Sequence, residues 1–197
     1  REQGAKVIAI CNTHGSSIPR ESDASLYTHA GPEIAVASTK AFLAQIAAVY
    51  LLGLYLAQLR GNKYKDEISA ILGELQKMPA KIQKVIDNDT LVKELGTEMK
   101  DTSSVIFLGR HVGFPVALEG ALKLKEISYI HAEGFAAGEL KHGPIALIEE
   151  GQPVIIIVPS AHGRESLHGK VVSNIQEVRA RGAFTIVIAE EGDEAVK

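Results

Sequence analysis

Four short runs of apolar, largely β-branched residues stand out along the chain, and longer stretches with helical periodicity separate them. The runs cover residues 6–11, 104–108, 153–158 and 183–189. They are continuously apolar or nearly so, which is typical of strands buried on both faces of a parallel sheet. The pattern therefore predicts an α/β fold in which parallel sheets are flanked by helices.

The longest apolar stretch, residues 41–57, lies within an expected helix over residues 40–59. We interpret it as a helix buried against a sheet, because it is shorter than the roughly 20 residues that cross a bilayer. The first residues, Arg1 to Gly4, contain no apolar signal region. Neither a membrane partner nor secretion is expected.

A helical connector is predicted in the middle of the chain. Residues 66–78 and 81–98 repeat apolar positions at helical spacing with charged residues between them. Pro79 separates the two patterns and fits near a helix start. We interpret this connector as structural.

A weak internal repeat links the two ends of the chain. Residues 1–11 (REQGAKVIAIC) and 179–189 (RARGAFTIVIA) share an Arg, a Gly, an Ala and two Ile at a constant offset. Both read as a helix end, a glycine cap and a buried strand. The repeat predicts two similar units, with both ends of the chain truncated.

The predicted division follows from the repeat and the connector. Residues 1–60 are interpreted as the C-terminal part of a first unit. Residues 61–102 form the connector. Residues 103–197 form a second, nearly complete unit that lacks its C-terminal tail.

Composition narrows the class of protein. The 197 residues are 46% hydrophobic and 23% charged, which is typical of a globular chain and excludes a disordered one. With 21 basic and 24 acidic side chains the net charge is −3, which argues against nucleic-acid and membrane-surface partners. The single cysteine, Cys11, excludes an internal disulfide and a cysteine-based zinc site. It is compatible with a cytoplasmic location.

Two turns after buried strands are candidate anion sites. Residues 109–115 and 159–166 each link a predicted strand to a helix, where open α/β sheets commonly bind ligands. The first turn does not match a dinucleotide or Walker motif. The alternatives are a tight strand-to-helix turn at the first and a helix cap by Ser160 at the second.

The segment over residues 121–144 contains the most candidate catalytic side chains. Lys123 and Glu126 are three apart and so are neighbours on one helix face, which a plain surface ion pair would also explain. A Gly/Ala-rich stretch that we expect to be a loop follows and carries several ionisable side chains. These are His131, Glu133, Glu139, Lys141 and His142. A carboxylate, a lysine and a nearby histidine suit proton transfer beside a carbonyl. The histidine spacing does not match a helical metal site, so no metal is expected.

A third candidate is the segment over residues 31–39 (GPEIAVAST), just before the long helix. The default interpretation is that Ser38 or Thr39 caps that helix. Together with Val36, the same segment can present backbone and hydroxyl groups to a polar ligand.

These motifs resemble a known family. Residues 121–147 (ALKLKEISYIHAEGFAAGELKHGPIAL) and residues 11–42 are similar to the sugar-isomerase (SIS) region of the glucosamine-6-phosphate synthases, the glutamine–fructose-6-phosphate aminotransferases. GELKHGP marks SIS enzymes broadly, whereas KLKEISYIHAE and VASTKAF point to the synthases. The resemblance covers essentially the whole chain.

The resemblance implies two SIS units, each a parallel five-stranded sheet between helices. Here it implies one truncated SIS unit followed by a nearly complete second one. It also implies a homodimer without a cofactor, behind an N-terminal glutaminase domain that this chain lacks. The implied reaction converts fructose 6-phosphate and glutamine-derived ammonia to glucosamine 6-phosphate.

Site roles are likewise implied by the resemblance. Glu126 would move a proton between sugar carbons C1 and C2, with Lys123 beside it. His142 would open the sugar ring in the neighbouring subunit's site, and Val36 and Ser38 would contact the sugar. The family's phosphate loop and its C-terminal lysine fall outside this sequence, so we expect the chain alone to be inactive.

The sequence is compatible with three other functions. One is a stand-alone SIS isomerase of another sugar phosphate, which an adjacent glutaminase domain would exclude. Another is a non-catalytic sugar-phosphate sensor, which needs no base such as Glu126. The third is a purely structural module.

Overall fold

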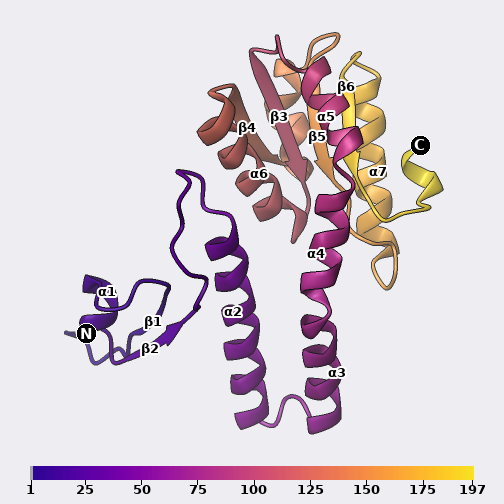
Figure 1. Ribbon diagram of the computed structural model, residues 1–197. Coiled ribbons are helices and arrows are strands. Elements are labelled where there is room, and N and C mark those ends of the chain that lie inside the picture. The colour runs from indigo at the N-terminus through magenta and orange to yellow at the C-terminus, as the bar shows by residue number, and fades with distance from the viewer. Residues whose placement is uncertain (1) are drawn as a thin grey trace. The chain divides into compact units, whose positions relative to one another are not determined.

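The computed structural model describes residues 2–197 (Figure 1). Arg1, the first position of the sequence repeat, lies outside the described residues. Contacts between Cα atoms divide the chain into two compact units, Arg1–Lys93 and Glu94–Lys197. The predicted boundaries near residues 60 and 102 stay predictions, and each compact unit is described by itself below.

The second unit is built on a four-stranded sheet in the order β4-β3-β5-β6, and every neighbouring pair is parallel. The strands are β3 (Ser104–Gly109), β4 (His131–Ala136), β5 (Pro153–Ile157) and β6 (Phe184–Ile188). Three of them match apolar runs in the sequence, so the predicted α/β fold with a parallel sheet is confirmed.

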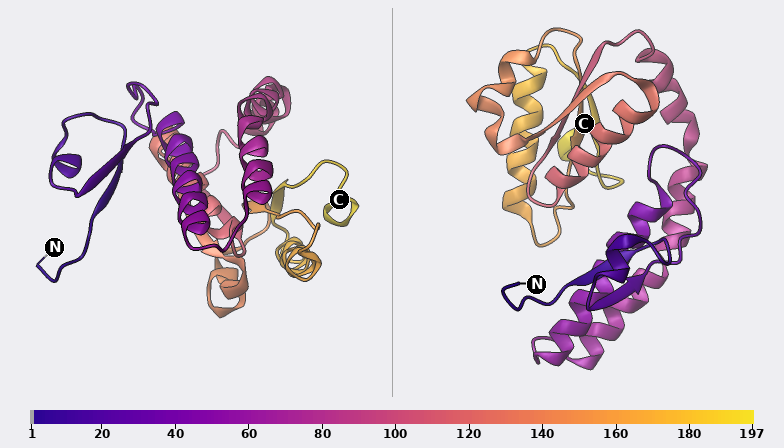
Figure 2. Two further views of the ribbon diagram at one scale, coloured as in Figure 1. Left: turned by 90° about the horizontal axis from the view of Figure 1, so that it is seen from below. Right: turned by 90° about the vertical axis from the view of Figure 1, so that its left-hand side faces the viewer.

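Helices cover both faces of this sheet (Figure 2, right). On one face, α6 (Gly113–Ser128) packs Ala117 and Ala121 against Val105 and Phe107. The other face is covered by three elements, which are α7 (Glu165–Arg179) and the 3₁₀ segments η1 (Ala137–His142) and η2 (Pro144–Leu147). There the core includes Leu108, Ile156, Leu140 and Val171, all 0% exposed. A short 3₁₀ turn, η3 (Glu194–Val196), follows β6.

Strand β4 corrects the sequence interpretation, which expected a loop here. It pairs with β3 along its full length, from Ser104 opposite His131 to Gly109 opposite Ala136. Alanine and glycine have low strand propensity, which hides the strand in the sequence. A glycine is needed at Gly134, because a Cβ there would lie 2.9 Å from Leu118 Cδ2 and 3.1 Å from Leu118 Cα.

The first unit contains a small two-stranded sheet followed by three helices. Strands β1 (Ile8–Cys11) and β2 (Ala24–Tyr27) are parallel, with α1 (Ser17–Arg20) between them. The sequence did not predict β2, which has only four residues. The helices α2 (Lys40–Leu59), α3 (Lys65–Gln76) and α4 (Met78–Asp87) follow.

The helices of the connector agree only in part with those predicted from the sequence. Pro79 lies in the first turn of α4, as predicted. The predicted helix over residues 81–98 is instead two helices. Helix α4 ends at Asp87, because the ψ of 52° at Asn88 is not helical, and α5 (Asp89–Glu98) starts directly after Asn88.

Helix α2 departs from its prediction as a helix buried against a sheet. Only Ala48 and Leu54 are buried among its residues, whereas Val49, Tyr50 and Leu59 are more than half exposed. Two strands of four residues cannot cover a 20-residue helix, which is about 30 Å long. Within the described chain, α2 alone has the length and composition to cross a membrane. Core helices of globular proteins meet the same criteria, so this property assigns no membrane role.

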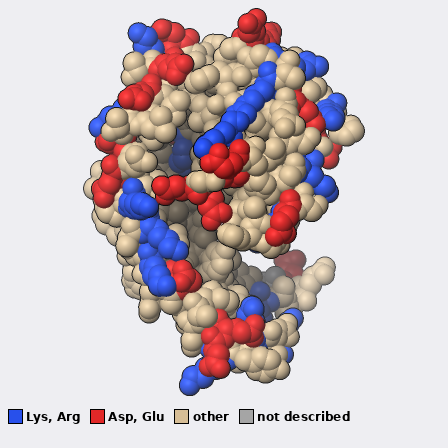
Figure 3. Space-filling view, turned by 90° about the vertical axis from the view of Figure 1, so that its right-hand side faces the viewer, with Lys and Arg blue, Asp and Glu red and all other residues tan. Residues whose placement is uncertain are grey.

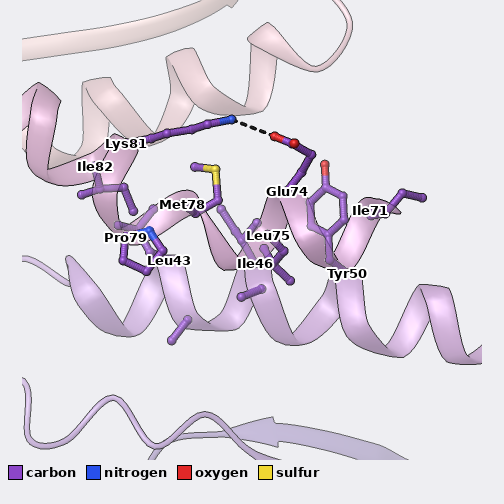
Figure 4. Close-up of a pocket in the computed structure, with 12 residues that line it drawn as sticks. Leu43, Ile46, Tyr50, Ile71, Glu74, Leu75, Met78, Pro79, Lys81 and Ile82 are labelled. Atoms are coloured by element: carbon purple, nitrogen blue, oxygen red, sulfur yellow. Dashed lines mark hydrogen bonds and ion pairs between the residues drawn. The ribbon is translucent and has the colours of Figure 1, made fainter. Parts of the chain in front are cut away.

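An apolar groove of about 550 Å³ lies between α2 and the α3–α4 pair (Figure 4). Leu43, Ile46 and Tyr50 of α2 face Leu75 and Met78 across it. The two charged residues on its wall lie close together, with Lys81 Nζ 3.1 Å from Glu74 Oε2. The groove therefore offers apolar surface and no unpaired charge.

The two ends of the sequence repeat share a local backbone conformation. Gly4 and Gly182, which are equivalent in the repeat, both have a φ of +80°. Each precedes a parallel strand, β1 after Gly4 and β6 after Gly182. Only glycine adopts such a φ without strain, so the repeat preserves a structural requirement.

Candidate functional site

Helix α6 brings together a lysine and two carboxylates. Lys123 Nζ lies 2.5 Å from Glu126 Oε2 and 3.4 Å from Glu119 Oε1. The three side chains are between 22% and 27% exposed, so the cluster is partly shielded from water. Sequence analysis predicted the Lys123–Glu126 contact and missed Glu119. The spacing of four residues between Glu119 and Lys123 could have identified it.

The cluster fixes the charge of the lysine. The hydrogen bond to Glu126 raises the pKa of Lys123, and the negative charge of Glu119 adds to the effect, while partial burial opposes it. Lys123 is therefore an ammonium at neutral pH. It can donate hydrogen bonds but cannot accept a proton, so Glu126 is the member of the predicted pair that can act as a base.

His142 lies on the other side of the sheet from this cluster. It ends η1, whose Ala137 and Leu140 belong to the core on the α7 face. Glu126 lies on α6, which packs on the opposite face. Both His142 and Glu126 belong to the second unit, so the sheet of that unit separates them within one chain.

The remaining ionisable residues of this segment lie apart from the lysine cluster. His131 Nε2 is 3.9 Å from Glu133 Oε2, and both side chains are more than half exposed. Glu139 is exposed on η1. In the part of the chain that the structure describes, no group of three His, Cys, Asp or Glu residues could hold a metal ion.

Lys141, next to His142, belongs to a row of polar contacts. Its Nζ lies 3.0 Å from Glu177 Oε1. Asn174 Nδ2 donates to Glu177 Oε2 at 3.3 Å, and Arg110 Nε donates to Asn174 Oδ1 at 3.1 Å. The row joins η1, α7 and the turn after β3.

The predicted sugar contacts lie in the first unit, in the segment before α2. Val36 is 92% exposed and Ser38 is half-buried. Thr39 occupies the N-cap position of α2, as predicted, but its side chain makes no capping hydrogen bond. The carboxylate of Glu33 supplies the acceptor instead, for the backbone N–H of Ala41 at 3.0 Å and of Thr39 at 3.3 Å.

Glu33 and Asn12 hold the two ends of this segment. The hydrogen bond from Ala41 is the largest cause of the lowered pKa of Glu33, so its carboxylate is favoured. Asn12 Oδ1 accepts from Ala30 N–H at 2.9 Å, and Asn12 Nδ2 donates to Gly31 O at 2.6 Å. The segment is therefore anchored at both ends, while Val36 between them faces outward. Neither anchor was singled out from the sequence.

The two candidate turns of the second unit meet at one cavity of about 440 Å³. Its lining residues are Arg110, His111, Gly163, Arg164, Glu165, Ser166, Leu167 and Lys170. The predicted cap by Ser160 is wrong, because α7 starts at Glu165. The Ser160 hydroxyl donates to Glu190 at 2.7 Å and accepts from His162 N–H at 3.3 Å.

A family model for the SIS domain matches residues 1–55 and 98–197. The chain belongs to the SIS domain family. The first match includes most of α2, and the second includes the whole four-stranded sheet. The SIS fold expected from the motifs is therefore confirmed.

The chain is also similar to particular SIS enzymes. Over its full length it is 79% identical to the glutamine–fructose-6-phosphate aminotransferase (isomerizing) of Corynebacterium glutamicum and 66% identical to that of Streptomyces coelicolor. It spans 32% of the length of each. Among solved structures, the C-terminal domain of the Francisella tularensis glucosamine-fructose-6-phosphate aminotransferase matches with a TM-score of 0.86 and 43% identity. That match covers 91% of this chain and 50% of the other.

The surface charge is mixed on one face of the protein. On the face drawn in Figure 3, basic and acidic side chains lie next to one another. Such mixing provides no extended positive surface on this face for a phosphate backbone.

Proposed function

We propose that this chain forms the isomerase part of a glutamine–fructose-6-phosphate aminotransferase. The observation that carries the proposal is the Lys123–Glu126 contact, 2.5 Å long and partly shielded on α6. It occurs in a SIS chain that is 79% identical to an aminotransferase of this name. The substrate is fructose 6-phosphate and the product glucosamine 6-phosphate.

Glu126 is the base in the proposed reaction. Its carboxylate removes a proton from C1 of the sugar, beside the C=N or C=O at C2, and leaves a planar enolamine-like or enediol-like intermediate. The nitrogen or oxygen at C2 gains a proton in this step. When Glu126 then returns its proton to C2, the C1 hydroxyl loses its proton and becomes the carbonyl oxygen of the product. One carboxylate can perform both transfers, provided that water is kept away from it.

Lys123 acts as a positioning residue in this scheme. Its ammonium holds Glu126 from one side and Glu119 from the other. Hydrogen bonds from a charged donor are stronger than neutral ones, so the carboxylate is oriented before substrate arrives.

His142 opens the sugar ring in the proposed mechanism, and it does so in a homodimer. The position of His142 and Glu126 on opposite faces of one sheet supports this arrangement. A substrate that touches Glu126 of one chain would then meet His142 of the partner subunit. Val36 and Ser38, on the anchored segment before α2, contact the sugar, and the enzyme works in the cytoplasm.

The proposal is tested with Glu126→Gln in the intact protein. We expect sugar isomerisation to fall by at least about a hundredfold, since general-base catalysis contributes about 10²–10⁴-fold. Fructose 6-phosphate should still bind, as measured by calorimetric titration. The matched control is Glu119→Gln, which removes the other carboxylate beside Lys123 and should keep most of the turnover.

Turnover that survives in Glu126→Gln would remove this residue from the role of base. If the unchanged protein binds the sugar phosphate but never isomerises it, the chain is a sensor. Preference for a different sugar phosphate would point to a stand-alone isomerase.

A further inference from the structure

The His142 segment, residues 141–143, combines the end of a 3₁₀ turn with an unusual glycine. His142 is the last residue of η1, and Gly143 follows it with a φ of +142° and a ψ of −57°. Glycine reaches this conformation without the strain that a side chain would cause, so the chain turns sharply before η2 begins at Pro144. Hydrogen bonds in 3₁₀ turns have poorer geometry than those of an α-helix. The position of His142 therefore depends on contacts between its segment and neighbouring elements.

Core packing fixes η1 as far as Leu140. Ala137 and Leu140 are 1% and 0% exposed and belong to the core on the α7 face. Gly138 lies against Arg110, whose terminal nitrogen would be 3.2 Å from a Cβ at this glycine. These contacts end before the His142 segment begins. The residues of that segment are all exposed, so core packing does not hold them in place.

An ion pair joins the His142 segment to α7. Lys141 Nζ lies 3.0 Å from Glu177 Oε1. Within residues 2–197 the imidazole of His142 has no hydrogen-bond or ion-pair partner of its own. Its position is therefore inherited from the backbone of its segment, and the ion pair of the preceding residue restrains that backbone.

The Glu177 end of this ion pair is held by further contacts. The Glu177 side chain is 21% exposed, against 66% for Lys141. Its Oε1 also accepts from Ser173 Oγ at 3.4 Å, and its Oε2 accepts from Asn174 Nδ2 at 3.3 Å. Asn174 is 5% exposed and accepts from Arg110 Nε at 3.1 Å. Because several donors hold this carboxylate, it is a fixed acceptor that orients the more exposed lysine.

We propose that Glu177 is a positioning residue for His142 and acts through Lys141. The inference rests on the proposed function, in which His142 opens the sugar ring. Ring opening breaks the bond between C2 and the ring oxygen. The ring oxygen gains a proton, and the hydroxyl at C2 loses its proton and becomes the ketone. Proton transfer needs a heavy-atom distance of about 2.6–3.2 Å, so a small displacement of the imidazole slows this step.

The proposal predicts a loss that is confined to one step. Glu177 lies on α7, whereas the base Glu126 lies on α6, which packs on the opposite face of the sheet. Removal of the charge of Glu177 should therefore slow ring opening and leave the proton transfer at C1 as it is. We expect ring opening to slow only about three- to fivefold, because partly exposed ion pairs contribute little energy.

The experiment compares two substrates in the intact protein. Fructose 6-phosphate is mostly cyclic and must open, whereas 5-deoxyfructose 6-phosphate has no free hydroxyl at C5 or C6 and stays open. The variant Glu177→Gln keeps the shape of the side chain and removes its charge. We expect kcat for fructose 6-phosphate to fall about three- to fivefold with KM unchanged, and kcat for the deoxy analogue to stay the same. The readout is the ratio of the kcat for fructose 6-phosphate to that for the analogue.

Conservative and matched variants test whether the ion pair is the cause. Lys141→Met should lower the ratio as Glu177→Gln does. Lys141→Arg can still donate to the carboxylate and should restore most of the ratio. The matched control is Glu149→Gln, because Glu149 is an exposed carboxylate of the same unit outside the row of polar contacts. Its ratio should equal that of the unchanged protein.

Two outcomes would overturn the proposal. In the first, Glu177→Gln lowers kcat for both substrates alike, as a general loosening of the fold would. In the second, the ratio falls in His142→Ala but stays the same in Glu177→Gln, which shows that His142 opens the ring without help from Glu177.

Failure of the proposed function gives a different pattern. Glu126→Gln should lose turnover of both substrates, because the open-chain sugar still needs a base. Turnover of both substrates by Glu126→Gln would overturn the proposed function, while the ratio in Glu177→Gln would still decide the positioning role. An unchanged ratio in His142→Ala would show that His142 does not open the ring, and the role of Glu177 would be overturned with it.

Discussion

A polar contact between two side chains holds the C-terminal end of the second unit to helix α7. His168 Nε2 and Asp193 Oδ2 are 2.6 Å apart, and their side chains are 10% and 15% exposed. Asp193 also accepts from the Ala195 N–H at 3.1 Å. The contact ties the turn after β6 to α7. The hydrogen bond to His168 is the largest cause of the lowered pKa of Asp193.

Replacement of Asp193 by Asn should lower the midpoint of thermal unfolding at neutral pH. A carboxylate whose pKa is lowered by folding stabilises the folded protein at pH values above its ordinary pKa, which is 3.8 for Asp193. This stabilisation is lost as the pH falls through the pKa of the folded state. The gap between the unfolding midpoints of the unchanged protein and the variant should therefore be full at about pH 5 and should narrow below pH 3.8.

Calorimetric scans at several pH values measure this gap. Asp101→Asn serves as the control, because Asp101 is exposed and makes no contact of this kind. A gap for Asp193→Asn that widens in acid would contradict the assignment.

At the scale of elements, glycines set how closely α6 approaches the sheet. At Gly120 a Cβ would lie 2.8 Å from Phe107 Cε1, and at Gly134 it would meet the backbone of Leu118. The phenyl ring of Phe107 can shift, whereas the α6 backbone cannot do so cheaply. Gly134 therefore fixes the distance between β4 and the helix that carries Lys123 and Glu126.

Gly134→Ala should destabilise the protein by about 1–3 kcal/mol, the usual cost of overpacking a core. Urea unfolding measures the change. The control is Gly169→Ala in α7, where nothing lies within 4 Å of the new Cβ and helix propensity favours alanine. Loss of stability in both variants alike would show that the close contact at Gly134 is not the cause.

At the scale of the whole molecule, the proposal that His142 acts in the partner subunit's site predicts two chains per active site. The requirement can be tested by mixing two inactive variants, Glu126→Gln and His142→Ala. In a mixed dimer one site would carry both changes and the other site neither.

Random pairing should restore about one quarter of the activity of the unchanged protein, since half of the dimers are mixed and each has one intact site. Activity is measured after the subunits have been exchanged, with each variant alone as the control. If both groups acted within one chain, every site would carry one change and no activity would return.

The sequence predicted the parts of the fold that depend on local pattern. Strands β3, β5 and β6 are apolar and β-branched, and the Lys123–Glu126 contact follows from helical spacing. Strand β4 was missed because close packing against α6 demands small residues with low strand propensity. The face on which His142 lies, and the meeting of two turns at one cavity, depend on the direction of the crossovers, which no local pattern records.

The row of polar contacts from Arg110 through Asn174 and Glu177 to Lys141 has a thermodynamic consequence. Side chains that share one network of polar contacts do not contribute independently to the free energy of unfolding. Arg110 and Lys141 are therefore energetically coupled through Asn174 and Glu177, and the effects of replacing the two do not add.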